Sequence, residues 1–178
     1  FGMRPKEARH FRPHGAVTPR AAAIARDAAA FAEHDTFVHI CHGTKGGRPR
    51  DVPITNDVQR ELLSRLQAVV AEGMYVGRPG YTSTQNSTRF YYVIRKVGIS
   101  KSGLGVVAHG LRHQYANDRF EADAGGPSPV RGGLDRPPGN VAARERVARA
   151  LGHNRSRVTT SYVGSDADYP VATIDPST

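Results

Sequence analysis

A strand–turn–strand pattern at residues 36–54 most constrains what this chain can fold into. Residues 36–41 are Thr-Phe-Val-His-Ile-Cys, which are types that favour β-strands. Residues 43–49 hold the glycines and the proline of a turn, and residues 50–54 have the pattern of a returning strand. The pattern predicts an antiparallel β-hairpin with Lys45 on the side of its tip.

Helical patterns surround this hairpin. In the helix expected to start at Thr55-Asn-Asp, apolar residues at helical spacing predict a core stripe made of Leu62, Leu63, Leu66, Val69 and Val70. The other expected helices are the end of a helix at residues 1–10, an Ala-rich helix from Thr18-Pro19 to Glu33, residues 84–97, 106–124 and 141–151, and a short helix through Val158 that carries Tyr162. We therefore expect a mostly helical α+β domain with a small antiparallel sheet.

Two segments lack such patterns. Residues 125–140 are rich in glycine and proline, which predicts a loop or disordered linker. This insert could be a disordered excursion, a DNA-contacting loop or a partner site. Residues 165–178 are a polar tail. The expected organisation is one domain at residues 1–164, followed by the tail.

The charge balance favours a polyanionic partner. The chain has 178 residues, enough for one domain with a core, and 25 Lys and Arg against 16 Asp and Glu give a net charge of +9. The alternative is a soluble protein that is merely basic. Cys41 is the single cysteine, so an intrachain disulfide is excluded, which suits a reducing cytoplasm. No apolar run is long enough to cross a membrane, and no signal peptide is visible.

Four polar stretches follow one another along the chain. Gly-Met-Arg-Pro-Lys-Glu holds Arg4 and Glu7, and Thr-Lys-Gly-Gly-Arg-Pro-Arg-Asp-Val-Pro-Ile holds Lys45. His-Gly-Leu-Arg-His holds His109 and Arg112, and Leu-Gly-His is followed nine residues after its histidine by a tyrosine; these last two positions are His153 and Tyr162. Each stretch alone is a weak signal. In this order and spacing they resemble the catalytic domain of the tyrosine recombinases, the phage-integrase family, over nearly the whole chain.

The resemblance implies site-specific DNA recombination by the integrase of a mobile element or prophage, in a bacterial cytoplasm at the nucleoid. Its partners would be a double-stranded attachment site and further copies of the chain, as a tetramer on DNA. Neither metal, ATP nor another cofactor is implied. The gaps from Arg4 to Lys45 and from Arg112 to His153 are longer than the family's. The chain does not begin with Met, and we expect a fragment without the family's N-terminal DNA-clamp domain.

The resemblance also assigns roles. Tyr162 is the expected nucleophile, and Arg4 and Arg112 would bind the nonbridging phosphate oxygens, because a guanidinium is planar, charged and bidentate. His109 and His153 would donate hydrogen bonds or move protons. Lys45 would enter the minor groove and protonate the leaving 5′-oxygen, and Glu7 would support Arg4. The basic residues expected to contact DNA are Arg48, Arg50, Arg89, Arg95, Lys96, Arg155 and Arg157.

Each assignment has an ordinary structural alternative. Tyr162 alone could be a half-buried helix tyrosine, and Lys45 a solvated loop lysine. His109 and His113, four apart, could be a core or surface pair or metal ligands, but no zinc-protease glutamate follows His109 and no third ligand stands out, so we expect no metal. Arg89, Arg95 and Lys96 could simply form the solvated charged face of the helix at residues 84–97. As whole functions, the alternatives are a type IB topoisomerase-like nicking and rejoining enzyme, or a degenerate DNA-binding module.

Overall fold

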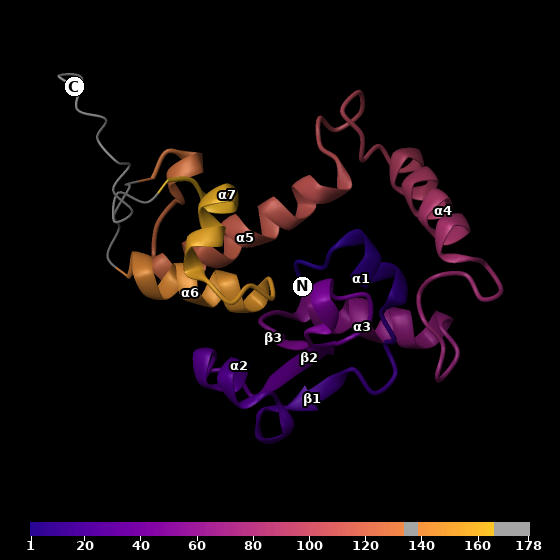
Figure 1. Cartoon of the computed structure of the whole chain (residues 1–178), viewed down its shortest axis with the longest axis horizontal. Helices are drawn as coiled ribbons and strands as arrows, with labels where there is room; N and C mark the ends of the chain where they lie inside the picture. The colour runs from indigo at the N-terminus through magenta and orange to yellow at the C-terminus, as the bar shows by residue number, and fades with distance from the viewer. Residues whose placement is uncertain (134–138, 166–178) are drawn as a thin grey trace.

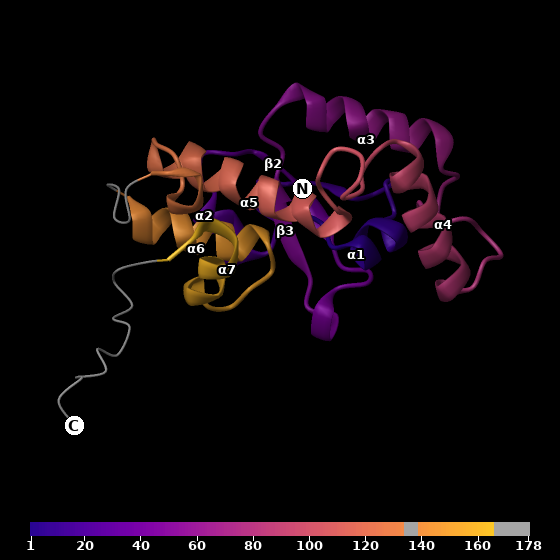
Figure 2. The same cartoon turned by 90° about the horizontal axis from the view of Figure 1, so that it is seen from above.

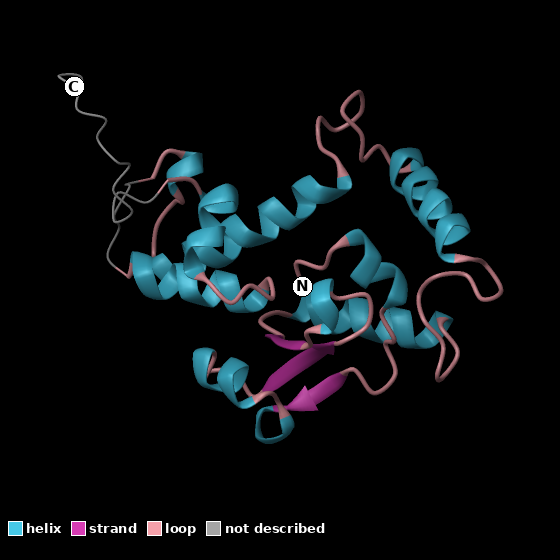
Figure 3. Cartoon of the chain, viewed as in Figure 1, coloured by secondary structure: helices cyan, strands magenta, loops and turns pink. Residues whose placement is uncertain are grey.

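The computed structural model describes residues 1–133 and 139–165, and it combines helices with one three-stranded antiparallel sheet (Figure 3). The strands are β1 (Val17–Pro19), β2 (Thr36–Ile40) and β3 (Arg50–Pro53), in the order β1-β2-β3. Val38 pairs with Val17 on one side and with Val52 on the other, and the side chains of Val38 and Val52 are fully buried. The predicted α+β class and hairpin are confirmed, with the tip formed by the 3₁₀ turn η2 (Lys45–Gly47).

The prediction of a helix that starts at Thr18-Pro19 is wrong. Thr18 pairs with Phe37 in the edge strand β1, where Pro19 is tolerated because an edge strand has one unpaired side. A 3₁₀ turn, η1 (Arg20–Ala22), follows, and helix α2 covers only Ala25–Ala30. The cap-and-proline signal was local, whereas the pairing partner of Thr18 lies on another segment of the chain.

The remaining elements are helices whose starts follow the predicted signals. Asn56 caps α3, because its side-chain oxygen accepts a hydrogen bond from the Gln59 amide at 3.0 Å. The first helix differs from the prediction that residues 1–10 are the end of a longer helix. It begins at Pro5, with Arg4 just before it, and ends at His10. The elements are α1 (Pro5–His10), α3 (Asp57–Val69), α4 (Ser83–Lys96), α5 (Ala108–Ala124), η3 (Pro129–Arg131), α6 (Asn140–Ala150), η4 (Ser156–Thr159) and α7 (Thr160–Val163).

The predicted core stripe of α3 is partly correct, with Val70 also partly buried just after the helix. Leu63 is buried and Leu66 is partly buried against the sheet core, but Leu62 is 45% and Val69 is 79% exposed. The helix lies along one side of the molecule (Figure 2) and covers the sheet core with a narrower strip than its sequence suggested.

Three packed clusters form the interior. One joins the sheet to α3, a second joins α5, α6 and α7, and a small third contains Phe31, Phe37 and Ala150. Tyr115 of α5 packs against all three. Figure 1 shows α5, α6 and α7 gathered on one side, the sheet with α1, α2 and α3 below them, and α4 standing apart beside α1. Tyr115 is therefore the side chain at which the two halves of the molecule meet.

The described part of the glycine-rich insert is docked on α5. The Ser128 hydroxyl is buried and donates a hydrogen bond to Asn117 Oδ1 at 2.5 Å, and Arg131 forms ion pairs with Asp118 and Glu121. Residues 125–133 are thus an ordered loop, while residues 134–138 of the insert and the expected tail from 166 to 178 lie outside the described residues. No helix within the described ranges has the length and apolar character to span a membrane.

Candidate active site

Arg112 lies at the centre of the candidate site. Its side chain is 1% exposed on α5 and spends its donors on three separate segments. Nη1 donates to the Gly2 carbonyl, Nη2 to the Leu151 carbonyl at 2.7 Å, and Nε to the Tyr162 hydroxyl at 3.4 Å. Gly2 has φ +57°, and a Cβ there would fall 2.4 Å from the Tyr115 ring, so only glycine lets this carbonyl approach. The Arg112 guanidinium therefore holds the N-terminal segment, the end of α6 and the hydroxyl of Tyr162 close together.

Beneath Arg112 lies a buried ion pair, here called the Glu7–Arg50 bracket. Arg50 donates two hydrogen bonds to the Glu7 carboxylate, at 2.9 and 2.8 Å, and a third from Nε to the Ala150 carbonyl at 2.8 Å. Glu7 also accepts from the backbone amide and from the guanidinium of Arg4, at 2.7 and 2.8 Å. Burial alone would raise the pKa of Glu7, but the hydrogen bonds and charge of Arg50, together with Arg4, outweigh it and lower the pKa to about 2. The bracket therefore stays ionised and holds Arg4 in place.

His153 enters the site from the end of α6. Gly152 has φ +72° and ends the helix, which turns the chain so that His153 follows directly. Burial, followed by the positive charges of Arg112, Arg4, Arg50 and Lys45, lowers the pKa of His153 to about 4. Its Nε2 lies 3.4 Å from Arg112 Nη2. A guanidinium only donates, so Nε2 is the acceptor and the imidazole is neutral at pH 7.

Tyr162 is held on a helix of one turn. The Asn117 side chain donates to the Tyr162 carbonyl at 3.1 Å, and Arg144 donates to the carbonyls of Gly164 and Ser165 at 3.2 and 3.1 Å. Val163 is fully buried beside it. A helix this short is unstable in isolation, so these contacts with α5 and α6 determine where the Tyr162 hydroxyl lies. The ring of Tyr162 is 8% exposed, and its centroid lies 5.9 Å from that of His153.

Two histidines of α5 flank the same tyrosine. The His113 ring lies 4.7 Å from the Tyr162 ring, and the His109 ring lies 6.2 Å from it, with 5.0 Å between the two histidines. His109 is exposed, whereas burial, with the charges of His109 and Arg112, lowers the pKa of His113. The sequence had singled out His109 and had left His113 as a packing or surface residue. Their i, i+4 spacing was the signal that both share one helix face.

Lys45 is not in contact with the other site residues. It is exposed at the hairpin tip, and its positive charge is the smallest of the contributions that lower the pKa of His153. Arg112 thus contacts both His153 and Tyr162, and Arg4 is linked to Arg112 through the Glu7 carboxylate. His109 lies at the edge of this group, and Lys45 lies on the hairpin loop.

The residues expected to contact DNA separate into three groups. Arg50 is a correction: its side chain is 2% exposed and bonded within the bracket, so it cannot lie on a DNA-facing surface. Arg48, Arg155 and Arg157 are exposed near the site. The three exposed cations of α4 lie beside α1 and away from α7 (Figures 1 and 2); they are Arg89, Arg95 and Lys96. Within the described ranges, no three His, Cys, Asp or Glu side chains are grouped so as to hold a metal ion.

The comparisons with known proteins give one match. A family model described as Integrase matches residues 1–118, which is more than half of the chain. The matched part contains Arg4, Glu7, Lys45, His109 and Arg112. No curated protein and no solved structure matches the chain. His153 and Tyr162 lie beyond the matched residues, so their place in the site rests on the geometry alone.

Proposed function

The chain belongs to the integrase family of tyrosine recombinases, and on this premise we propose that residues 1–164 form its catalytic domain, which cuts and rejoins DNA through a phosphotyrosine at Tyr162. The family gives a role in DNA integration and recombination. The covalent chemistry is the part proposed here. One observation carries it: among the described residues, Tyr162 is the one tyrosine whose hydroxyl Arg112 contacts, and it lies 50 residues away in sequence and outside the family match.

Charge stabilisation comes from arginine. Arg4 and Arg112 both lie at the Glu7 carboxylate of the bracket, with Arg4 Nη1 2.8 Å from Oε1 and Arg112 Nη1 4.0 Å from Oε2. A phosphate held between them would share its nonbridging oxygens with two guanidinium groups as negative charge develops in the pentavalent transition state. The chain's own residues can therefore supply the electrostatic part of the reaction.

Two proton transfers accompany the cut. Tyr162 Oη forms the new bond to phosphorus and gives its proton to the imidazole of His153, which burial and the surrounding arginines keep unprotonated while weakening it as a base. The bond from phosphorus to the 5′-oxygen breaks, and Lys45 Nζ gives that oxygen a proton. Rejoining runs in reverse, when the 5′-hydroxyl of a new strand attacks the phosphotyrosine.

The other tyrosine close to Arg112 is unsuited to attack. Burial raises the pKa of Tyr115 to about 12, and its ring packs against all three interior clusters. Its phenol is harder to deprotonate than a free phenol, whose pKa is near 10. This contrast supports Tyr162 as the nucleophile.

The experiment is a covalent-adduct assay on nicked duplex carrying the element's own attachment site. We expect a protein–DNA adduct with the wild type, none with Tyr162→Phe, and DNA binding by both. The adduct should persist in EDTA. Mass spectrometry that places the phosphodiester on another tyrosine contradicts the assignment. Strand exchange between two duplexes distinguishes a tetrameric recombinase from a nicking and rejoining enzyme, and binding without an adduct indicates a degenerate binding module.

A further inference from the structure

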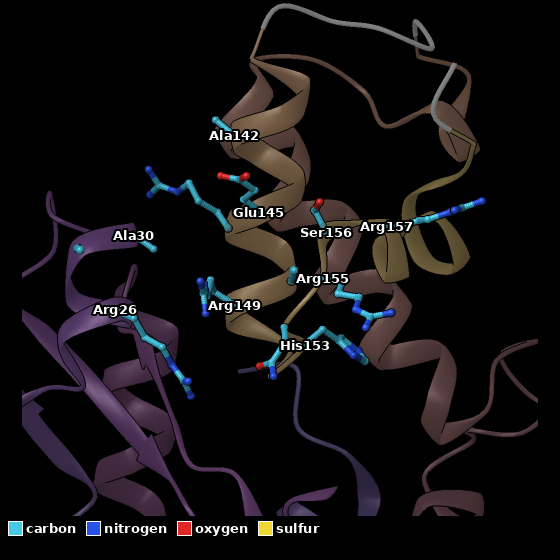
Figure 4. Close-up of a pocket in the computed structure, with 13 residues that line it drawn as sticks. Arg26, Ala30, Ala142, Glu145, Arg149, His153, Arg155, Ser156 and Arg157 are labelled. Carbon is cyan, nitrogen blue, oxygen red and sulfur yellow. The ribbon is translucent and has the colours of Figure 1, made fainter. Parts of the chain in front are cut away.

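An open groove runs beside the site between α2 and α6. Its volume is about 770 Å³, and residues 153–157 close one end of it. Figure 4 shows Arg26 of α2 and Arg149 of α6 extending from facing walls, with His153 at the end of α6 and Arg155 on the other side of that helix. Because His153 lines both, the groove begins where the candidate active site ends.

The lining of the groove suits a sugar–phosphate backbone better than a base. Ala30 and Ala142 line it with short side chains, which leave the space open. Apart from His153 no aromatic side chain lines it, so there is no platform on which a base would stack. Its charged lining consists of five arginines and one carboxylate; these are Arg26, Arg146, Arg149, Arg155, Arg157 and Glu145.

Two of these arginines are uncommitted. The guanidinium groups of Arg149 and Arg155 form no hydrogen bond or ion pair with any residue in the described ranges. Arg26 is half exposed; its Nη2 donates one long hydrogen bond to the Pro49 carbonyl at 3.4 Å, and its Nε lies 3.7 Å from the Asp27 carboxylate, which leaves Nη1 without such a contact among the described residues. In contrast, Arg146 is already paired with Glu33 and Asp123. Free guanidinium groups on the walls of an open groove are available to an external anion.

The groove is continuous with the hairpin. A second, much smaller cleft lies between the hairpin and the end of α6, and it shares Arg26, Arg149, His153 and Asn154 with the groove. Its other wall includes Arg48, three residues after Lys45. A basic track therefore runs from the hairpin tip, past His153, and along α6.

The geometry points to this α2–α6 groove as the path of the DNA strand next to the cleavage point, with Arg26 and Arg149 binding its phosphates from opposite sides. The inference rests on the proposed function for its partner, which is duplex DNA, and adds where the backbone lies. It also adds two contact residues, Arg26 and Arg149, that the sequence had not singled out.

The first test is a salt titration of binding to a short fluorescent duplex of arbitrary sequence, because phosphate contacts do not depend on sequence. Each lost phosphate contact lowers the slope of log K against log salt by about 0.9. We expect the double variant Arg26→Gln/Arg149→Gln to lower the slope by roughly 2. The matched control is Arg65→Gln on α3, where Arg65 is exposed and paired only with its helix neighbour Glu61, and its slope should equal that of the wild type.

A second variant changes binding in the opposite direction, which misfolding cannot imitate. Glu145 is the one carboxylate that lines the groove, so Glu145→Gln should tighten binding to the same duplex. Unchanged affinity in Glu145→Gln, an unchanged slope in the double variant, or an equal loss in the Arg65 control would each overturn the inference.

Footprinting of the trapped covalent adduct then locates the strand. We expect hydroxyl-radical protection beside the cleavage point in the wild type, and its loss in the Arg26→Gln/Arg149→Gln adduct. Equal protection in both overturns the inference. A wild type that binds DNA and forms no adduct refutes the proposed reaction, while the salt titration still decides whether the groove holds phosphates.

Discussion

Arginine does two different things in two neighbouring regions of this molecule. In the Glu7–Arg50 bracket, Arg50 is 2% exposed and its donors are spent on a carboxylate and a carbonyl. In the α2–α6 groove, Arg149 and Arg155 have no such partner among the described residues. Sequence alone gives both kinds the same positive charge. The difference teaches that the partner of each guanidinium, within the chain or outside it, decides whether the residue stabilises the fold or binds a ligand.

Breaking the bracket should give the largest effect. Arg50→Met leaves the Glu7 carboxylate buried without its main partner, which costs about 3–5 kcal/mol of unfolding free energy. The double variant Glu7→Met/Arg50→Met removes both charges and should recover much of that loss. Urea denaturation measures both. A double variant less stable than Arg50→Met would show that the bracket contributes through more than charge compensation.

Arg112 combines the two uses of arginine, because it is buried like Arg50 and also contacts Tyr162, the proposed nucleophile. Arg112→Ala should reduce the rate of adduct formation about 100- to 1,000-fold, by analogy with the loss of one oxyanion donor. Arg112→Lys should recover little, since the planar fork that reaches Gly2, Leu151 and Tyr162 together is lost. Single-turnover kinetics on folded variants provide the measurement, and a fully active lysine variant would contradict the bidentate role.

Lowering the pH should reduce the unfolding free energy in two stages, first through His153 and then through Glu7, while the groove arginines stay charged. The pKa of His153 falls from 6.5 to about 4 on folding, so the unfolded chain binds the extra proton and stability declines as the pH falls through this range. The pKa of Glu7 falls from 4.5 to about 2, so its contribution of about 3 kcal/mol is present above pH 4.5 and is lost as the pH approaches 2. Unfolding free energy measured against pH should lose the upper stage in His153→Gln. Survival of that stage would assign it to another group.

The smallest effect is expected on α4. Arg89, Arg95 and Lys96 are as exposed as the groove arginines but lie beside α1, away from Tyr162. Changing each to Gln should lower the salt slope of binding to a long duplex by at most about 0.9 per residue, and should leave adduct formation on a minimal duplex unchanged. If an α4 variant lost as much cleavage as an Arg26 or Arg149 variant, the basic surface of α4 would be as important for the reaction as the groove beside Tyr162.

Local signals predicted the local structure well. The hairpin, the Asn56 cap and the helix from residue 84 were readable because strand-forming residues, caps and glycines act on their immediate neighbours. Features decided by distant segments were missed. Thr18-Pro19 forms a strand because Thr18 pairs with Phe37, and Leu62 and Val69 are exposed because none of the described elements covers them on α3.

The same limit applied to the site. The order of the four motifs predicted which residues would gather, and the structure brings Arg4, Arg112, His153 and Tyr162 together. Arg50 was misassigned to DNA because its acceptors lie 43 and 100 residues away, on Glu7 and Ala150. His113 was passed over because its contact with the Tyr162 ring depends on how α7 packs, which spacing does not encode.

On the proposed function, the long sequence separation within the bracket also bears on when, during synthesis, the chain becomes able to cut DNA. Arg50 meets Glu7 early, but its third acceptor is the carbonyl of Ala150, 100 residues later. Proteins are made from the N-terminus onward, so a chain still on the ribosome at residue 149 already has Arg4 and Lys45 but lacks the carbonyl that accepts this third hydrogen bond from Arg50. The same chain lacks His153 and Tyr162. On the proposed function, a growing chain therefore contains some of the proposed catalytic residues before the site can be complete.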